Sequence, residues 1–143
     1  MNVTQLSLFI ENQPGHLQNV LRILANENIN ITTLTIAEIN DFGILRLIVN
    51  NPEKAAAALK NAGVAFSKTE VLGLEIGNEP GSLCRAIETF SKEKINIEYM
   101  YAFTQKVDDK AVMIFRFEDI DAAKKAATKA GLKIVKNEDI TGA

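Results

Sequence analysis

The chain begins with residues that alternate between apolar and polar, and it then changes to a helical period. Residues 3–10 alternate with period two, which is typical of a strand with one buried face. From Leu17 the apolar residues recur every three or four positions, which indicates an amphipathic helix. Period two returns after Asn30, and Asn40 to Gly43 have the composition of a tight turn. The pattern therefore predicts a strand, a helix and a β-hairpin, in that order.

The rest of the first half adds a helix and a strand. Asn51 and Pro52 are a favourable cap and first helical position, and Gly63 is a favourable end. We expect the second hairpin strand at Ile44 to Val49 and a closing strand from Val64 to about Lys68. The order strand, helix, strand, strand, helix, strand is that of the split βαβ fold, a four-stranded antiparallel sheet with two helices on one face.

A six-residue segment of the first half returns in the second half. Asn12-Gln13-Pro14-Gly15-His16-Leu17 matches Asn78-Glu79-Pro80-Gly81-Ser82-Leu83 at an offset of sixty-six residues. The same offset relates Ile29-Asn30-Ile31 to Ile95-Asn96-Ile97, beyond the first helix of each copy. A match over two separate segments indicates a duplicated module.

The duplication predicts the extent of each module. Later segments match at an offset of sixty-eight, so two residues are inserted at about Lys106 to Lys110, in a turn between strands. We therefore predict an α+β protein of two tandem ferredoxin-like βαββαβ modules, residues 1–69 and 70–143, each an antiparallel sheet with helices on one face. The last strand is expected from Leu132 to about Asn137.

In this fold, the side chains opposite the helices line an open sheet face. In the first module the alternation places on that face Gln5, Ser7, Phe9, Thr33, Thr35, Arg46 and Ile48. In the second module it places there Val71, Gly73, Glu75, Tyr99, Tyr101, Phe103, Ile114 and Arg116. The second set is too aromatic for a surface in water. We therefore expect this face to pack on another subunit, in a homo-oligomer such as a dimer.

Composition excludes several classes of function. The chain has 143 residues, of which 47% are hydrophobic and 24% charged, and this composition is typical of a globular protein. The net charge of −2 does not favour nucleic acid or anionic membranes as partners. No apolar run has the length of a membrane span and no charged leader begins the sequence, so we expect a cytoplasmic protein. The single cysteine, Cys84, cannot form an internal disulfide.

The sequence lacks the residue groups of common catalytic sites. His16 is the single histidine, and its counterpart in the second copy is Ser82, so the module does not require an imidazole there. One histidine and one cysteine do not make a zinc site, and no nucleophile with a base and no cofactor motif is present. We therefore expect no catalytic residue, no metal and no cofactor.

Two features resemble nucleic-acid-binding surfaces but have simpler explanations. Tyr99, Tyr101 and Phe103 fit the aromatic sheet face of RNA-recognition domains, but the basic glycine-aromatic run of those domains is missing. A local basic run in the second half has acidic neighbours, and a solvated helix face explains it. It consists of Lys124, Lys125, Lys129, Lys133 and Lys136.

The Asn-x-Pro-Gly-x-Leu loop has chemistry that suits a small anion. Gly15 permits backbone conformations closed to other residues, and the N–H groups that follow belong to a helix N-terminus, which binds carboxylates. Asn12 can hold the ammonium and carboxylate of an amino acid, or it can cap its own turn. Both interpretations stay open from the residues alone, because a folding motif duplicates as readily as a binding motif.

The loop, the later Ile-Asn-Ile and the order of elements together resemble the ACT domains, small regulatory modules that bind amino acids and control metabolic enzymes. The resemblance covers nearly the whole chain, as in stand-alone tandem ACT proteins of bacteria that are similar to acetolactate synthase regulatory subunits. It implies a ligand at the seam between modules, where the loop of one module meets the second strand of another. By motif it implies Asn12, Asn30, Asn78 and Asn96 as ligand-binding residues, and the loop and helix N-terminus described above add Gly15, His16, Gly81 and Ser82.

One position departs from the serine-sensing members of that family. They have a histidine two positions before the loop asparagine, where this chain has Ile10 and Ile76, so the resemblance favours a less polar ligand than serine. The expected function is a non-enzymatic regulatory protein that binds a small amino acid or a similar anionic metabolite. One alternative is a structural subunit that docks a metabolic enzyme through its sheet face without a ligand. An acylphosphatase-type enzyme would need an arginine in the loop from Asn12 to Leu17, which has none.

Overall fold

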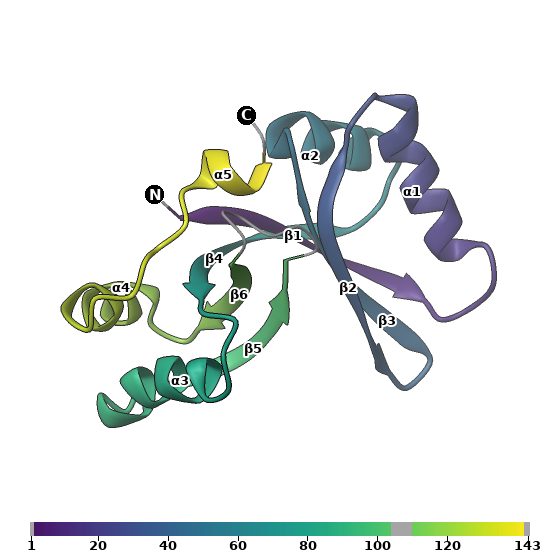
Figure 1. Ribbon diagram of the computed structural model, residues 1–143. Helices are drawn as coiled ribbons and strands as arrows, with labels where there is room; N and C mark the ends of the chain where they lie inside the picture. Colours follow the sequence, from purple (N-terminus) through teal and green to yellow (C-terminus); the bar gives the residue numbers. More distant parts are fainter. Residues whose placement is uncertain (1, 104–109, 142–143) are drawn as a thin grey trace. The chain divides into compact units, whose positions relative to one another are not determined.

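The predicted elements of the first half form in the expected order. They are β1 (Val3–Glu11), α1 (His16–Asn26), β2 (Ile31–Ile39), β3 (Phe42–Val49) and α2 (Pro52–Asn61). In the computed structural model, which describes residues 2–103 and 110–141, Thr4–Thr69 make up the body of one compact unit, the N-terminal unit. β3 pairs antiparallel with β1 and β2, and the first residues of β4 (Phe66–Ile76) also belong to this unit (Figure 1).

The core of the N-terminal unit lies between the sheet and its two helices. Leu24 of α1 and Leu59 of α2 pack in one cluster with strand residues that include Leu6 and Leu8, and all four are fully buried. The alternation predicted for β1 is confirmed, because Leu6 and Leu8 face this core while Phe9, between Leu8 and Ile10, is 63% exposed.

The register confirms which side chains share the opposite face of this sheet. Arg46 is the cross-strand partner of both Ser7 and Thr35, and Thr33 pairs with Ile48. Thr33 and Ile48 are nevertheless buried, as is Gln5. The alternation therefore assigned these residues to the correct face, but it did not show that part of this face is shielded from solvent.

Short-range signals set the ends of the elements. The side chain of Asn51 caps α2, since its Oδ1 accepts a hydrogen bond of 3.1 Å from the backbone N–H of Lys54. Asn40, with φ of +55°, lies in the hairpin turn between β2 and β3. β3 begins at Phe42, two residues before the predicted start at Ile44, because Phe42 pairs with both β1 and β2.

β2 has one strand neighbour among the described residues, so it is an edge strand of its sheet. Leu34 and Ile36 pair with core residues of β3, which places them on the helix side, as predicted. They are 40% and 49% exposed, however, because the helices do not cover this edge fully.

The C-terminal unit has its body in Glu70–Ile140. It contains most of β4, followed by α3 (Ser82–Lys92), β5 (Ile97–Ala102), β6 (Ala111–Phe117), α4 (Ile120–Lys129) and α5 (Asn137–Thr141). β6 pairs antiparallel with β4 and β5. Its core contains three packed aromatic rings, with centroids 4.7 Å apart for Phe90 and Phe117 and 5.5 Å apart for Phe115 and Phe117. The α+β class, with antiparallel strands and helices in both units, is confirmed.

Two predicted strand boundaries were wrong. Val64 to Lys68 and Val71 to Ile76 were expected as two strands, but residues 66–76 form the single strand β4, because no residue between them breaks the extended backbone. The last strand, expected from Leu132 to about Asn137, is reduced to one bridge between Ile134 and Leu74. The short helix α5 then begins at Asn137. The predicted insertion falls almost entirely on residues 104–109, outside the described residues.

The packing of Ile140 explains why the last strand is short. The backbone N–H of Val135 donates to the carbonyl oxygen of Gly73 at 2.8 Å, and α5 then turns Ile140 back onto the sheet. A Cβ built on Gly73 would lie 2.7 Å from Cδ1 of Ile140, so this residue occupies the space above the glycine. Val71 and Ile114 on this face are fully buried. The face predicted to be free of helices is therefore partly covered by the chain itself.

Candidate functional site

The Pro-Gly loop of the N-terminal unit leads from β1 into α1. Gly15 is the last residue before the helix and has φ of +94°, in the left-handed region that favours glycine. A Cβ at this position would meet nothing within 4 Å, so the backbone conformation and not crowding requires glycine. No side chain caps α1, but the backbone N–H of His16 donates to the carbonyl oxygen of Gln13 at 3.3 Å, so the first of its amides already has a backbone acceptor.

The loop of the C-terminal unit repeats this geometry. Gly81 precedes α3 with φ of +86°, and no side chain caps this helix. The guanidinium of Arg85 lies over this turn, because Nη1 is 2.9 Å from the position of a Cβ on Gly81 and Nη2 donates to Oγ of Ser82 at 3.3 Å. The backbone N–H of Ser82 donates to the carbonyl oxygen of Glu79 at 3.1 Å, as His16 does to Gln13. Both copies therefore present a helix N-terminus without a side-chain cap behind a left-handed glycine.

A hollow adjoins each loop. The first has a volume of about 350 Å³, and its lining includes Ile10, Asn12 and Gly15. The second has a volume of about 420 Å³ and includes the matching Ile76, Asn78 and Gly81. Each hollow is thus bounded by the end of a strand, the loop asparagine and the start of a helix, with an apolar wall on one side.

The remaining predicted asparagines lie elsewhere. Asn30 precedes β2, and its backbone N–H donates to Oδ1 of Asn50 at 3.1 Å. Since β1 and β2 both run antiparallel to β3, Asn12 after β1 and Asn30 before β2 lie at opposite ends of the sheet. β2 has nine residues, so about 30 Å separates these ends at roughly 3.3 Å per residue.

The C-terminal unit separates its pair in the same way. Asn78 follows β4 and Asn96 precedes β5, and both strands run antiparallel to β6. Neither unit by itself brings its two asparagines together. A site that contains a loop asparagine and a strand asparagine must therefore draw them from two modules.

The two corners differ in charge. In the first, Oε2 of Glu11 lies 3.8 Å from Nε2 of the half-exposed His16. The aligned residues in the second are Gly77 and Ser82, but Glu79 lines that hollow where the first has Gln13, so the second corner also has a carboxylate, and it gains Arg85. A guanidinium at a helix N-terminus favours an anion more strongly than the amides alone. Sequence reasoning missed Arg85, although its position three residues after Ser82 places the two on one helix face.

Glu75 is a buried carboxylate outside the predicted site. Its side chain is 7% exposed, with Nζ of Lys110 3.1 Å from Oε1 and Nζ of Lys133 3.2 Å from Oε2. Burial by itself raises the pKa of this carboxyl, but the hydrogen bonds and charges of the two lysines outweigh burial and hold its pKa below the ordinary value. Lys133 lies next to the bridge residue Ile134, so this ion pair holds the last segment against β4.

Three further findings concern other kinds of site. Among residues 2–103 and 110–141, no group of three or more histidine, cysteine, aspartate or glutamate side chains is placed to hold a metal ion. None of the helices in the described part of the chain is long and apolar enough to cross a membrane. Cys84 is a free and exposed thiol, with Sγ 3.7 Å from Oε1 of Glu88.

Several solved structures share this fold. Protein BT0572 from Bacteroides thetaiotaomicron is 38% identical and has a TM-score of 0.92, with 100% of this chain and 98% of that chain covered. The ligand-free regulatory subunit of aspartate kinase from Thermus thermophilus is 18% identical, with a TM-score of 0.60 and coverage of 89% and 91%. The regulatory subunit of aspartate kinase from Thermus flavus is 16% identical, with a TM-score of 0.63 and coverage of 92% and 94%.

The identity to the two aspartate kinase subunits is low, so their likeness shows a common fold and no more. No curated protein matches the chain. The family model for the ACT domain pair matches residues 1–142. The resemblance predicted from the Pro-Gly loops is therefore confirmed, and the chain belongs to the family of ACT domain pairs.

Proposed function

We propose that this protein is a non-enzymatic regulatory protein that binds a small amino acid at its Pro-Gly corners. The observation that carries the proposal is the pair of matching hollows, each placed at a helix N-terminus without a side-chain cap behind a left-handed glycine. First-turn amides at such a terminus bind a carboxylate through hydrogen bonds and through the helix dipole. This geometry suits the α-carboxylate that all amino acids share.

The corner residues have distinct roles in this proposal. Gly15 and Gly81 let the ligand carboxylate approach the backbone, and Asn12 and Asn78 orient the ammonium with their side-chain oxygens. The apolar residues Ile10 and Ile76 border the hollows and favour a ligand with an apolar side chain.

We expect the second corner to bind more tightly than the first. Arg85 adds a positive charge beside Gly81 and Ser82, whereas no arginine lines the first hollow. Each hollow has one carboxylate in its lining, that of Glu11 in the first and that of Glu79 in the second. The ligand carboxylate is attracted by the guanidinium of Arg85, whereas a carboxylate side chain acts on it at both corners. The ligand stoichiometry is therefore one per chain at low concentration and two per chain at high concentration.

The regulatory output in this proposal is a change in association. The strand asparagines Asn30 and Asn96 would complete each site from another module, because each lies about one strand length from the loop of its own unit. A ligand held between modules of two chains stabilises the arrangement in which they meet, and it acts through its higher affinity for that arrangement. The expected assembly is a homo-oligomer that controls a metabolic enzyme.

A thermal denaturation screen against the twenty amino acids tests this proposal. We expect at least one amino acid to raise the melting temperature, and we expect Asn78→Ala to remove most of that increase. Asn26→Ala is the control, because Asn26 is exposed at the far end of α1 and lies outside both hollows. A screen without any stabilising amino acid, or equal loss in both variants, would contradict the proposal.

A further inference from the structure

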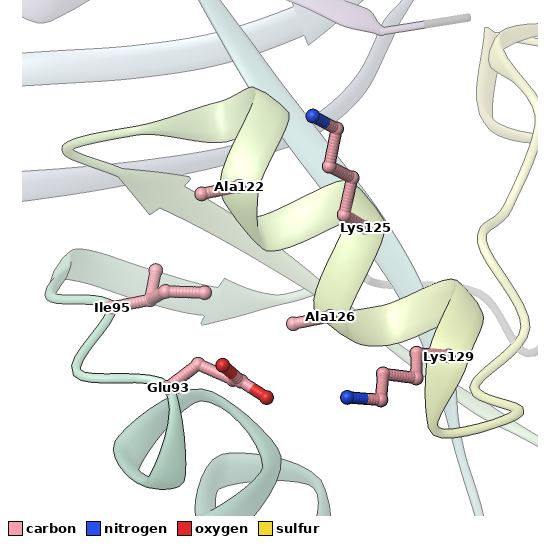
Figure 2. Close-up of a pocket in the computed structure, with 6 residues that line it drawn as sticks. All are labelled: Glu93, Ile95, Ala122, Lys125, Ala126 and Lys129. Atoms are coloured by element: carbon pink, nitrogen blue, oxygen red, sulfur yellow. The ribbon is translucent and has the colours of Figure 1, made fainter.

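A groove lies between α3 and α4 in the C-terminal unit. One part of it has a volume of about 270 Å³, and its lining includes the apolar residues Ile95, Ala122 and Ala126. Figure 2 shows these three side chains around the space, with Glu93 and Lys129 pointing toward one another at one end. An adjoining hollow of about 250 Å³ shares Ala126 and Lys129 with the first. The two hollows therefore form one continuous depression with an apolar floor.

Positive side chains line this depression, although Figure 2 shows the ammonium of Lys125 pointing away from the space. Lys125 and Lys129 rise from α4, and Arg85 and Lys92 line the part beside α3. All four are exposed, and none of them forms an ion pair with another described residue. We name the four cations and the apolar floor the basic groove. The one carboxylate in its lining is that of Glu93.

The duplication supplies an internal comparison for these charges. The four aligned residues of the N-terminal unit are uncharged: they are Asn19, Asn26, Ala57 and Asn61. That unit forms both helices and packs them on its sheet without any of these charges. Lys92 and Lys129 lie in the last turns of α3 and α4, where a positive charge complements the helix dipole, but Arg85 and Lys125 do not, so the helices by themselves do not account for all four cations. They are a property of one copy and point to a ligand of opposite charge.

We propose that the basic groove docks an acidic amphipathic helix of a partner protein. An apolar floor accepts the apolar side chains of such a helix, and the surrounding cations pair with its carboxylates. The apolar floor does not suit a nucleic acid, whose phosphates need a continuous basic surface. This surface is separate from the amino-acid site proposed above, except that Arg85 borders both.

A synthetic peptide provides the probe. The peptide is a fluorescein-labelled helix with leucines at positions i, i+4 and i+7 and glutamates on either side of them, and a scrambled peptide of the same composition is its control. Fluorescence anisotropy with the full chain measures the affinity. We expect the double variant Lys125→Glu and Lys129→Glu to bind at least tenfold more weakly, because two attractions become repulsions.

Two further variants separate the groove from general charge effects. Lys54→Glu with Lys60→Glu makes the same change in net charge on exposed positions of α2, and we expect binding within twofold of the unaltered protein. Ala122→Leu places a larger side chain in the apolar floor and should weaken binding at least fivefold. Circular dichroism shows whether each variant is folded, and Ala122→Leu carries the test if the charge variant does not fold.

Three results would overturn the proposal. One is that the ordered and scrambled peptides bind equally well, or that neither peptide binds. Another is equal weakening by the two pairs of lysine substitutions, which would show a general effect of charge. The third is tighter binding of a single-stranded oligonucleotide of the same net charge, which would assign the surface to nucleic acid instead.

Discussion

Replacing Ile140 by alanine tests whether its contact with the sheet holds α5 in place. Ile140 is 2% exposed, and its Cδ1 lies 2.7 Å from where a Cβ would stand on Gly73. Truncation of a buried isoleucine to alanine lowers the free energy of unfolding by about 2–5 kcal/mol. Because α5 has five residues, it can settle toward the sheet and reduce the cavity. We therefore expect a loss of about 2 kcal/mol, at the lower end of that range.

Gly73→Ala perturbs the same contact from the other side. When Ile140 is present, the new methyl group forces its side chain to move. We expect the free energy of unfolding to fall by about 1 kcal/mol, the lower limit for overpacking, because the displaced atom is the end of a flexible side chain. After Ile140→Ala the nearest atoms are Cβ of Val135 at 3.5 Å and Cδ1 of Ile114 at 3.7 Å, which are ordinary contacts. Alanine in a strand is about 0.5–1 kcal/mol more favourable than glycine. The same substitution should therefore change from destabilising to stabilising.

Urea denaturation of the four proteins, followed by circular dichroism, measures this double-mutant cycle. The expected coupling free energy between the two positions is about 1.5 kcal/mol, within the range for residues in contact. Ile140→Val removes only Cδ1, the atom that lies above Gly73, so it should cost about 1 kcal/mol and should also remove the penalty of Gly73→Ala. If Gly73→Ala has the same effect with and without Ile140→Ala, the contact between α5 and the sheet does not exist in solution.

Three further predictions follow from single side chains. Glu75 has a lowered pKa in the folded state, so its stabilising effect is present above the ordinary glutamate pKa and is lost as pH falls through the folded value. Glu75→Gln should therefore make the free energy of unfolding less dependent on pH in that acidic range. Denaturation at a series of pH values measures this. Asp119→Ala removes the hydrogen bond of 3.0 Å that the side chain accepts from the N–H of Ala122, and it should lower the free energy of unfolding by about 1 kcal/mol. Urea denaturation measures the loss, and an unchanged value would show that the cap is not formed. Gly15→Ala places a side chain at φ of +94° and should cost about 1–2 kcal/mol even though the space is open, so a neutral effect on thermal unfolding would contradict the left-handed conformation.

Local patterns were sufficient to predict the elements and their repetition. Asn51 caps its helix as expected, and Asp119 caps the matching helix of the second unit, because a cap depends on residues within one turn of each other. Asn40 lies in a tight hairpin turn for the same local reason. The two Pro-Gly loops have the same left-handed glycine in both copies, so their duplication in sequence is also a duplication in geometry.

The last segment shows where local patterns stop being sufficient. Leu132 to Asn137 has the composition of a strand, but only Ile134 forms a bridge. Whether such a segment pairs along its whole length depends on the part of the sheet on which it packs. Here the sheet has an open space above Gly73, and Ile140 of α5 fills that space after the chain has left the strand. These two residues are sixty-seven positions apart, so no periodicity connects them.

The sequence by itself determined the order of elements, the duplicated module and the loops that identify the family, because each depends on neighbouring residues or on an internal match. Only the tertiary structure decided which charges share a surface. Lys125 and Lys129 belong to what the sequence presents as a solvated helix face, and packing of α4 beside α3 places them around the same groove as Lys92. Side-chain periodicity fixes which face of a helix a residue occupies, but the neighbour of that face is set by contacts between segments distant in the chain.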